Sequence, residues 1–245
     1  MAIKAITFDL DNTLWPLAPT LQRAEQATYQ WLEQHAEKIC ERFSAEDIVA
    51  ERMQLFQREP TLQWQISQLR INSIKELAQR SGYDKQRAEQ ISSQAFQFFY
   101  SLRQQVTPYP GVEKTLESLS ARYELATISN GNADVASTAL GGYFSFSLNA
   151  ETLGSGKPEK EIFLAAIDTF NHCREQPLVA GEIAHIGDDF SCDIVGAQRA
   201  GIKTVWLKRV GEESPTSRAV AGEKEITADV IIDEIRILPE VIAAL

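Results

Sequence analysis

The chain has 245 residues, enough for one substantial hydrophobic core with an insertion. Its 24 lysines and arginines against 34 aspartates and glutamates give a formal net charge of −10. Nucleic acid is therefore not an expected partner, because it favours clustered Lys and Arg. The three cysteines, Cys40, Cys173 and Cys192, have no paired spacing, and no apolar run approaches the roughly 18 residues of a membrane span. We expect a cytoplasmic protein with no membrane partner.

The predicted elements begin with a short apolar strand that ends at Phe8. After Leu14 the pattern changes to helical spacing for about ninety residues. Ser44 to Asp47 resembles a capping box with Asp in place of Glu. Four helices are predicted in this region: one capped by Thr20, one from Ser44 to Pro60, one from Leu62 to Arg80 and one from Asp84 to Gln105.

A turn at Pro108 to Gly111 is followed by alternating helices and strands. Helices are predicted near 112–122, 132–140, 158–171 and 193–200, with a short one at the end. Strands are predicted near 124–129, 183–187, 203–207 and 228–232, and a loop from Gly211 to Glu225. This alternation predicts an α/β fold with a mostly parallel sheet and right-handed crossovers.

Two carboxylates, Asp9 and Asp11, follow directly after the first strand, and Thr13 comes two residues later. A buried carboxylate must be paired, protonated or bound to a metal, so folding alone gives no reason for acids there. Open α/β sheets place their ligands at the carboxyl ends of the strands. The pattern therefore indicates a chemical site.

The second strand ends in Ser129, Asn130 and Gly131, which offer a hydroxyl and exposed backbone N–H groups to an anion. Further on, Pro158 suits the first position of a helix, which places Lys157 just before its positive end. Both segments favour the binding of an anion such as phosphate.

A third strand, near 183–187, ends at Asp188 and Asp189, and Asp193 lies at the start of the next predicted helix. In a parallel sheet these positions share an edge with the groups above. The sequence thus predicts one site that combines acids, a hydroxyl and a lysine.

The order of these motifs, Asp-x-Asp-x-Thr, a strand-end Ser, a Lys and Gly-Asp-x-x-x-x-Asp, resembles the haloacid dehalogenase superfamily, whose members are mostly phosphatases. The resemblance implies a Rossmann-like core over 1–15 and 106–245. It also implies an all-helical cap over 16–105 that closes the site from water. The implied activity is Mg²⁺-dependent hydrolysis of a small-molecule phosphate ester, by a monomer or a homodimer.

The same resemblance implies roles for the motif residues. Asp9 would be the nucleophile that forms an aspartyl-phosphate. Asp11 would protonate the leaving alcohol and then deprotonate the attacking water. The phosphate oxygens would be held by Thr13, Ser129, Asn130, Gly131 and Lys157.

A hard cation such as Mg²⁺ suits a set of carboxylates. The resemblance implies that Asp9 and Asp188 bind it through their side chains and Asp11 through its backbone carbonyl. Asp193 would be a ligand or would support one. Asp189 is either a further neighbour of the ion or a helix-capping acid.

Within the superfamily, Phe8 to Trp15, Ser129 to Ala133 and Gly187 to Asp193 resemble the bacterial flavin mononucleotide phosphatase group. That group also acts on 5-amino-6-(5-phospho-D-ribitylamino)uracil, so either compound is an implied substrate. Asn12 and Trp15 stand where Asp and Tyr are expected. Trp15, at the entrance to the cap, is expected to affect which ligand fits.

In the predicted cap, Trp64 and Arg70 offer a planar ring and a guanidinium, which suit a flavin-like or phosphorylated substrate. Helix packing is the more ordinary role of both residues, so their inclusion in the site is the least specific of these predictions.

Four alternatives stay open. A phosphonatase would need a cap lysine for a Schiff base, and Lys38, Lys75 and Lys85 lie in that region. A phosphomutase would use the same core. A haloacid dehalogenase would not need Asp11, which argues against it. An inactive binding module is disfavoured because the acids and Lys157 are all present.

Overall fold

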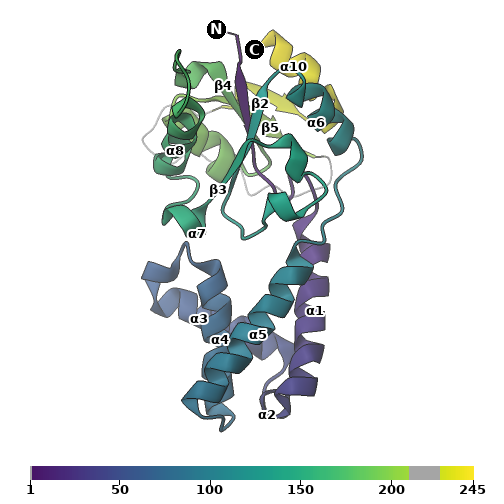
Figure 1. Ribbon diagram of the computed structural model, residues 1–245, viewed down its shortest axis with the longest axis vertical. Helices are drawn as coiled ribbons and strands as arrows, with labels where there is room; N and C mark the ends of the chain where they lie inside the picture. The colour runs from purple at the N-terminus through teal and green to yellow at the C-terminus, as the bar shows by residue number, and fades with distance from the viewer. Residues whose placement is uncertain (1, 210–226) are drawn as a thin grey trace. The chain divides into compact units, whose positions relative to one another are not determined.

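The computed structural model describes residues 2–209 and 227–245, so the predicted loop from Gly211 to Glu225 lies outside the described residues. Six parallel strands form one sheet in the order β3-β2-β1-β4-β5-β6. Figure 1 labels β2, β3, β4 and β5 of this sheet. The predicted α/β class is confirmed. The strands are β1 (Ala5–Phe8), β2 (Glu124–Ser129), β3 (Phe146–Asn149), β4 (Ile183–Gly187), β5 (Lys203–Leu207) and β6 (Val230–Ile232).

Burial explains why the central strands form. All residues of β1 and β4 are buried, which is typical of parallel strands covered on both faces. Phe8 pairs with Thr127 of β2 and with Ile186 of β4. The carboxyl ends of these strands therefore lie at one edge of the sheet, where the polar motifs begin.

Helices cover both faces of this sheet (Figure 1). One face carries α8 (Lys160–Asn171) and α9 (Gly196–Arg199), and the other carries α6 (Val112–Ser120) and α10 (Leu238–Ala244). Apolar side chains of α8, such as Ile162 and Phe163, pack in one cluster with residues of the sheet. This packing fixes the strands whose ends carry the site.

The structure corrects three sequence predictions. Instead of a helix near 132–140 there are short 3₁₀ turns at Val135–Ser137 and Gly141–Tyr143. A strand, β3, was not predicted; it is only four residues long and is followed by the one-turn helix α7 (Ala150–Leu153). Helix α8 begins at Lys160 rather than at Pro158, after a turn in which Glu159 N–H donates to the Gly156 carbonyl.

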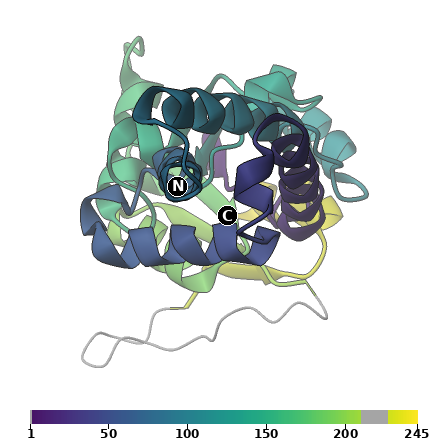
Figure 2. The ribbon, with the colours of Figure 1, turned by 90° about the horizontal axis from the view of Figure 1, so that it is seen from below.

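A second compact unit spans Leu17–Val106, whereas the first joins the residues up to Pro16 to those from Thr107 onward. Figure 2 shows the long helices of the second unit in purple to blue. Its helices are α1 (Leu17–His35), α2 (Glu37–Cys40), α3 (Ala45–Arg58), α4 (Ile66–Arg80) and α5 (Lys85–Arg103).

The predicted capping box is present at the start of α3, where Ser44 and Asp47 exchange side-chain to backbone hydrogen bonds. Asp84 caps α5. Thr20 does not cap α1, because the helix begins at Leu17 and Thr20 is buried within it. The unit has its own apolar core, with Leu32, Ile74 and Ile91 among its members.

Among the described residues, no helix combines the length and the apolar character needed to cross a membrane.

Candidate active site

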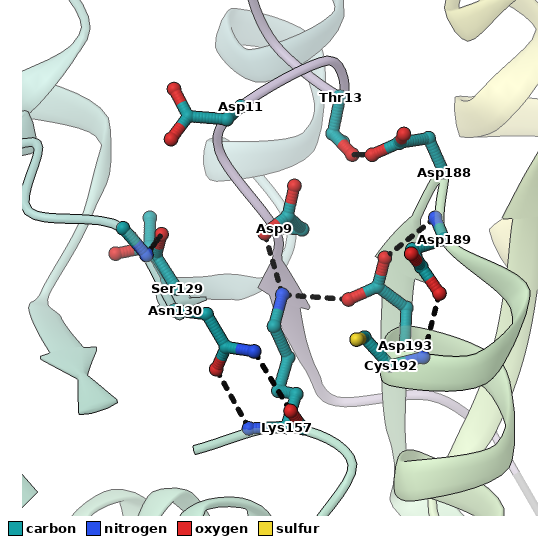
Figure 3. A network of polar contacts seen from close by, with 12 residues as sticks. Asp9, Asp11, Thr13, Ser129, Asn130, Lys157, Asp188, Asp189, Cys192 and Asp193 are labelled. Atoms are coloured by element: carbon teal, nitrogen blue, oxygen red, sulfur yellow. Dashed lines mark hydrogen bonds and ion pairs between the residues drawn. The ribbon is translucent and has the colours of Figure 1, made fainter. Parts of the chain in front are cut away.

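The end of β1 places a buried carboxylate at the edge of the sheet. Asp9 is 7% exposed, and its backbone N–H donates to the Ile186 carbonyl of β4. Its Oδ1 lies 2.5 Å from Nζ of Lys157, which is 3% exposed (Figure 3). The first acid of the motif is therefore in direct contact with the predicted lysine.

Lys157 also contacts a second carboxylate. Its Nζ lies 2.6 Å from Oδ1 of Asp193, which is 1% exposed. The same oxygen lies 3.2 Å from Nε2 of the fully buried His185, whose Nδ1 is 2.8 Å from the Thr7 hydroxyl. A neutral His185 that donates from Nε2 and accepts at Nδ1 satisfies all three groups.

Both oxygens of Asp193 have protein partners. Oδ2 accepts the backbone N–H of Asp189 at 3.0 Å. Gly187 makes room for this carboxylate, because a Cβ at that position would come within 2.1 Å of Asp193 Oδ2. The side chain is therefore held from several directions, and it holds Lys157 in turn.

Asp188 and Thr13 connect the other side of the site. The Thr13 hydroxyl donates to Asp188 Oδ1 at 2.9 Å, and Trp206 Nε1 donates to the Asp188 backbone carbonyl at 2.8 Å. One carboxylate oxygen each from Asp9, Asp188 and Asp193 lies within 4.8 Å of the others. Asp189 instead accepts the Cys192 N–H at 2.8 Å, which is a helix-capping contact.

The end of β2 supplies the polar groups opposite. The amide of Asn130 makes two hydrogen bonds with the Lys157 backbone, both of 2.7 Å. Ser129, 2% exposed, accepts the Gly131 N–H at 2.9 Å. Figure 3 shows Ser129 and Asn130 on the same side of Lys157. The structure thus brings the predicted motif residues of the first unit together.

Burial and neighbouring charges shift the pKa values of the three acids in different directions. Burial raises the pKa of Asp9 well above its usual range, and Asp193 and Asp188 raise it further against the opposing effect of Lys157. Burial and the Asp193 charge raise the pKa of Asp188 to about 6. Burial also opposes the ionisation of Asp193, but Lys157 and His185 outweigh it and lower its pKa to about 2.

These shifts describe a site with excess negative charge. A cation would relieve the repulsion between Asp9 and Asp188, and carboxylate oxygens are ligands that Mg²⁺ prefers. Asp9 and Asp188 therefore fit the part of side-chain ligands. Because both oxygens of Asp193 accept hydrogen bonds from protein groups, Asp193 is suited to position Lys157 rather than to bind the cation directly.

Asp11 lies on the loop after β1, and its side chain extends away from Lys157 (Figure 3). Its Oδ1 accepts a hydrogen bond of 2.8 Å from Nε1 of Trp15. Trp15 is fully buried, and its aromatic ring packs in the core. An effect of Trp15 on which ligand fits stays a prediction.

The two cap residues of the predicted site belong to the second unit. Arg70 Nη1 donates to Glu25 Oε1 at 3.0 Å, and its guanidinium lies 3.6 Å from the Phe99 ring centroid. Burial and the neighbouring Arg52 lower the pKa of Arg70 to about 9. Trp64 is half-buried in the turn before α4. A role for either residue in substrate binding stays a prediction.

Sequence reasoning missed contacts that come from the far end of the chain. Arg209 donates to the Thr13 carbonyl at 2.7 Å and to the Asn12 carbonyl, and its guanidinium lies 3.8 Å from the Tyr109 ring centroid. Trp206 was missed in the same way. Trp206 lies in β5 and Arg209 just after it, and this strand carries no motif, so the sequence holds no local signal for them.

Comparisons with known proteins agree with this geometry. The model of the haloacid dehalogenase-like hydrolase family matches residues 3–201, and the chain belongs to this family. The predicted fold and enzyme class, a hydrolase of the haloacid dehalogenase type, are confirmed.

Two particular proteins are similar over most of their length. The 5-amino-6-(5-phospho-D-ribitylamino)uracil phosphatase YigB of Escherichia coli (strain K12) is 30% identical over 206 residues, which cover 84% of each chain. The crystal structure of a 2-haloacid dehalogenase from Pseudomonas syringae pv. Tomato DC3000 is 36% identical, with a TM-score of 0.86 over 99% of each chain.

A third similarity concerns the fold alone. The HAD-hydrolase YfnB from Bacillus subtilis, bound to magnesium, is 17% identical with a TM-score of 0.63 over 99% of each chain.

Proposed function

We propose that this hydrolase is a phosphatase that uses Mg²⁺ and an aspartyl-phosphate on Asp9 to hydrolyse a small phosphate monoester. The observation that carries the proposal is the contact of 2.5 Å between Asp9 Oδ1 and Lys157 Nζ, beside two further acids at the same sheet edge. A phosphate monoester reacts very slowly in water, so positioning and charge neutralisation must supply most of the acceleration.

In the proposed first step, Asp9 attacks phosphorus while the ester P–O bond breaks. Because Lys157 engages Oδ1, we assign the attack to Oδ2. Asp11 gives its proton to the leaving oxygen, so the product is a neutral alcohol. Water then attacks phosphorus, loses a proton to Asp11 and regenerates the Asp9 carboxylate with release of phosphate.

Other residues hold the phosphoryl group. Lys157 neutralises charge on Asp9 and on the phosphoryl oxygens, while the Ser129 hydroxyl and the N–H groups after it bind those oxygens. Thr13 orients Asp188 through their hydrogen bond of 2.9 Å. A Mg²⁺ ion held by Asp9, Asp188 and the Asp11 carbonyl would cancel the repulsion between the nucleophile and the substrate.

The substrate is the finer part of the proposal. The similarity to the Escherichia coli phosphatase supports 5-amino-6-(5-phospho-D-ribitylamino)uracil, and flavin mononucleotide carries a closely related ribityl phosphate. Both substrates present a primary alkyl phosphate, whose leaving group needs the proton that Asp11 would supply.

A haloacid dehalogenase is the second candidate, because a solved structure of that description is 36% identical over 99% of the chain. Displacement of a halide needs no general acid. The presence of Asp11, held by a hydrogen bond from Trp15, therefore favours the phosphatase.

The decisive experiment measures phosphate release from a panel of monoesters that includes both flavin-related compounds, nucleotides and sugar phosphates, with Mg²⁺ and with EDTA. We expect Mg²⁺-dependent release by the wild type and none by Asp9→Asn. The matched control is Asp168→Asn, an exposed acid on α8, which should keep wild-type activity.

A wild type that releases halide from 2-haloacids, and no phosphate from any ester, would overturn the proposal. Release that persists undiminished in Asp9→Asn would instead leave the hydrolysis standing and contradict the aspartyl-phosphate.

A further inference from the structure

The loop that carries Asp11 is a tight turn between Leu10 and Trp15. The Asn12 N–H donates to the Trp15 carbonyl at 2.7 Å, and the Leu14 N–H donates to the Leu10 carbonyl at 2.8 Å. Asn12 adopts a φ of 61°, in the left-handed region that Asn tolerates better than most residues. The turn thus brings the side chain at position 15 back to the one at position 11.

Contacts from outside the turn fix its backbone. Arg209 donates to the Thr13 carbonyl at 2.7 Å, and the Tyr109 N–H donates to the Leu14 carbonyl at 2.9 Å. With the backbone held in this way, the main freedom left to Asp11 is rotation of its side chain.

The indole of Trp15 restricts that rotation. Trp15 is 0% exposed, so its ring cannot move without disturbing the core, and its Nε1 lies 2.8 Å from Asp11 Oδ1. An indole N–H can only donate. The bond therefore persists whether Asp11 is a carboxylate or a carboxylic acid, and in the acid it favours the proton on Oδ2.

We infer that Trp15 is a positioning residue for the general acid and base Asp11. It anchors Oδ1, so that Oδ2 gives the proton to the leaving oxygen and takes one from water. This inference rests on the proposed function, in which Asp11 has that role. In the proposed function Lys157 and Ser129 bind the phosphoryl group. Trp15 does not contact it, and affects the reaction only by positioning Asp11 for proton transfer.

The competing explanation is that the hydrogen bond merely satisfies a buried indole N–H. The two explanations differ in their dependence on the leaving group. An alkyl alcohol leaves poorly without a proton, whereas p-nitrophenolate leaves well without one. The base role of Asp11 in the second step is common to both esters, whereas kcat/KM reports only the steps up to cleavage of the ester bond. In kcat/KM a positioning role must therefore affect the two kinds of ester unequally, and a structural role affects them alike.

The test compares Trp15→Phe with the wild type on an alkyl phosphate and on p-nitrophenyl phosphate, with Mg²⁺ present. General acid catalysis contributes about 10²- to 10⁴-fold, so we expect kcat/KM for the alkyl ester to fall about 10-fold or more. For the aryl ester we expect kcat/KM to fall at most about 3-fold.

Trp206→Phe is the matched control. It removes another buried indole N–H, which donates to the Asp188 carbonyl rather than to Asp11. We expect it to lower kcat/KM for both esters by the same factor. In an Asp11→Asn background, Trp15→Phe should have no further effect on the alkyl ester, because its partner in the proton transfer is gone.

An equal fall for both esters in Trp15→Phe, or an additive effect in the double variant, would overturn the inference. A wild type that hydrolyses no ester would instead refute the proposed function. If Trp15→Phe does not fold, Trp15→Met, which also lacks the N–H donor, replaces it in the same comparison of kcat/KM for the two esters and is judged by the same criteria.

Discussion

Asp193 shows what a single residue does at this site. It lies five residues beyond Asp188, on the π-helical turn Phe190–Val195, and is held by Lys157, His185 and the Asp189 N–H. The acid that the motif pattern marks as a metal ligand has both oxygens occupied by protein donors. Asp193 then affects the reaction by positioning Lys157, which contacts the proposed nucleophile Asp9.

His185 extends that network into the sheet and allows a test of stability. We expect His185→Leu to lower the free energy of unfolding by about 1–3 kcal/mol, because it removes a partner from buried Asp193 and from Thr7. His185→Gln should recover part of this loss, since its amide can still donate to Asp193.

Urea denaturation of the three proteins measures these differences. Equal stability of His185→Leu and the wild type would show that the network contributes nothing to folding.

At the scale of elements, the strand ends place the site residues, and ion pairs connect the helices of the second unit. Asp9, Ser129 and Asp188 come from three adjacent strands that pair in parallel, so their convergence needs no long side chain. In the second unit, Glu25 joins three helices, because it pairs with Arg52 of α3 at 2.9 Å and with Arg70 of α4 at 3.0 Å. Glu51 with Arg80 and Arg58 with Glu76 also link α3 to α4, and Glu25 adds the connection of both helices to α1.

The Glu25 contacts predict a dependence of stability on pH. Burial opposes ionisation of Glu25, but the hydrogen bonds and charges of Arg52 and Arg70 lower its pKa below the usual 4.5. Because the folded state holds the carboxylate more strongly than the unfolded state does, its contribution is present above pH 4.5 and is lost as the pH falls through the lower, folded pKa.

Thermal melting of the wild type and of Glu25→Gln as a function of pH checks this sign. We expect the melting temperatures to differ most near neutral pH and to converge as the pH falls below 4.5 and through the folded pKa. The matched control is Glu76→Gln, which removes an exposed pairing with Arg58 and should give a smaller difference. A constant gap between wild type and Glu25→Gln would contradict the expectation.

For the whole molecule, the excess negative charge of the site links metal binding to stability. Three buried or half-buried acids face one lysine, and burial raises the pKa of both Asp9 and Asp188. A ligand that binds only the folded state stabilises it by about 2.7 kcal/mol at 100 times its Kd. The proposed Mg²⁺ site should therefore be visible in unfolding, without any substrate.

We expect Mg²⁺ to raise the melting temperature of the wild type relative to EDTA, and we expect this increase to vanish in Asp188→Asn. Asp168→Asn, whose acid lies outside the site, should keep it. An equal increase in Asp188→Asn would place the ion elsewhere on this acidic protein.

The sequence by itself determined the α/β class and the family, and it predicted the residues of the candidate site. Each motif is local, because it consists of neighbouring residues: an apolar run followed at once by acids, a hydroxyl or a lysine. Such a motif can be recognised in the sequence before the fold is known. Ser44 and Asp47 could be identified as a capping box for the same reason. The fold class and the enzyme class are confirmed, whereas the predicted roles of Asp9, Asp11 and Lys157 stay predictions until the variants are measured.

The tertiary structure decided what depends on distant partners. Strand β3 was missed because four residues at the sheet edge carry little apolar signal, although Phe146 and Leu148 alternate with polar residues. Trp15 proved to be buried, with its Nε1 donating to Asp11. Arg209 reaches the Asp11 loop across nearly 200 positions. Local propensity cannot encode such contacts, because the sheet register and the packing of the core select them only when the whole chain is folded.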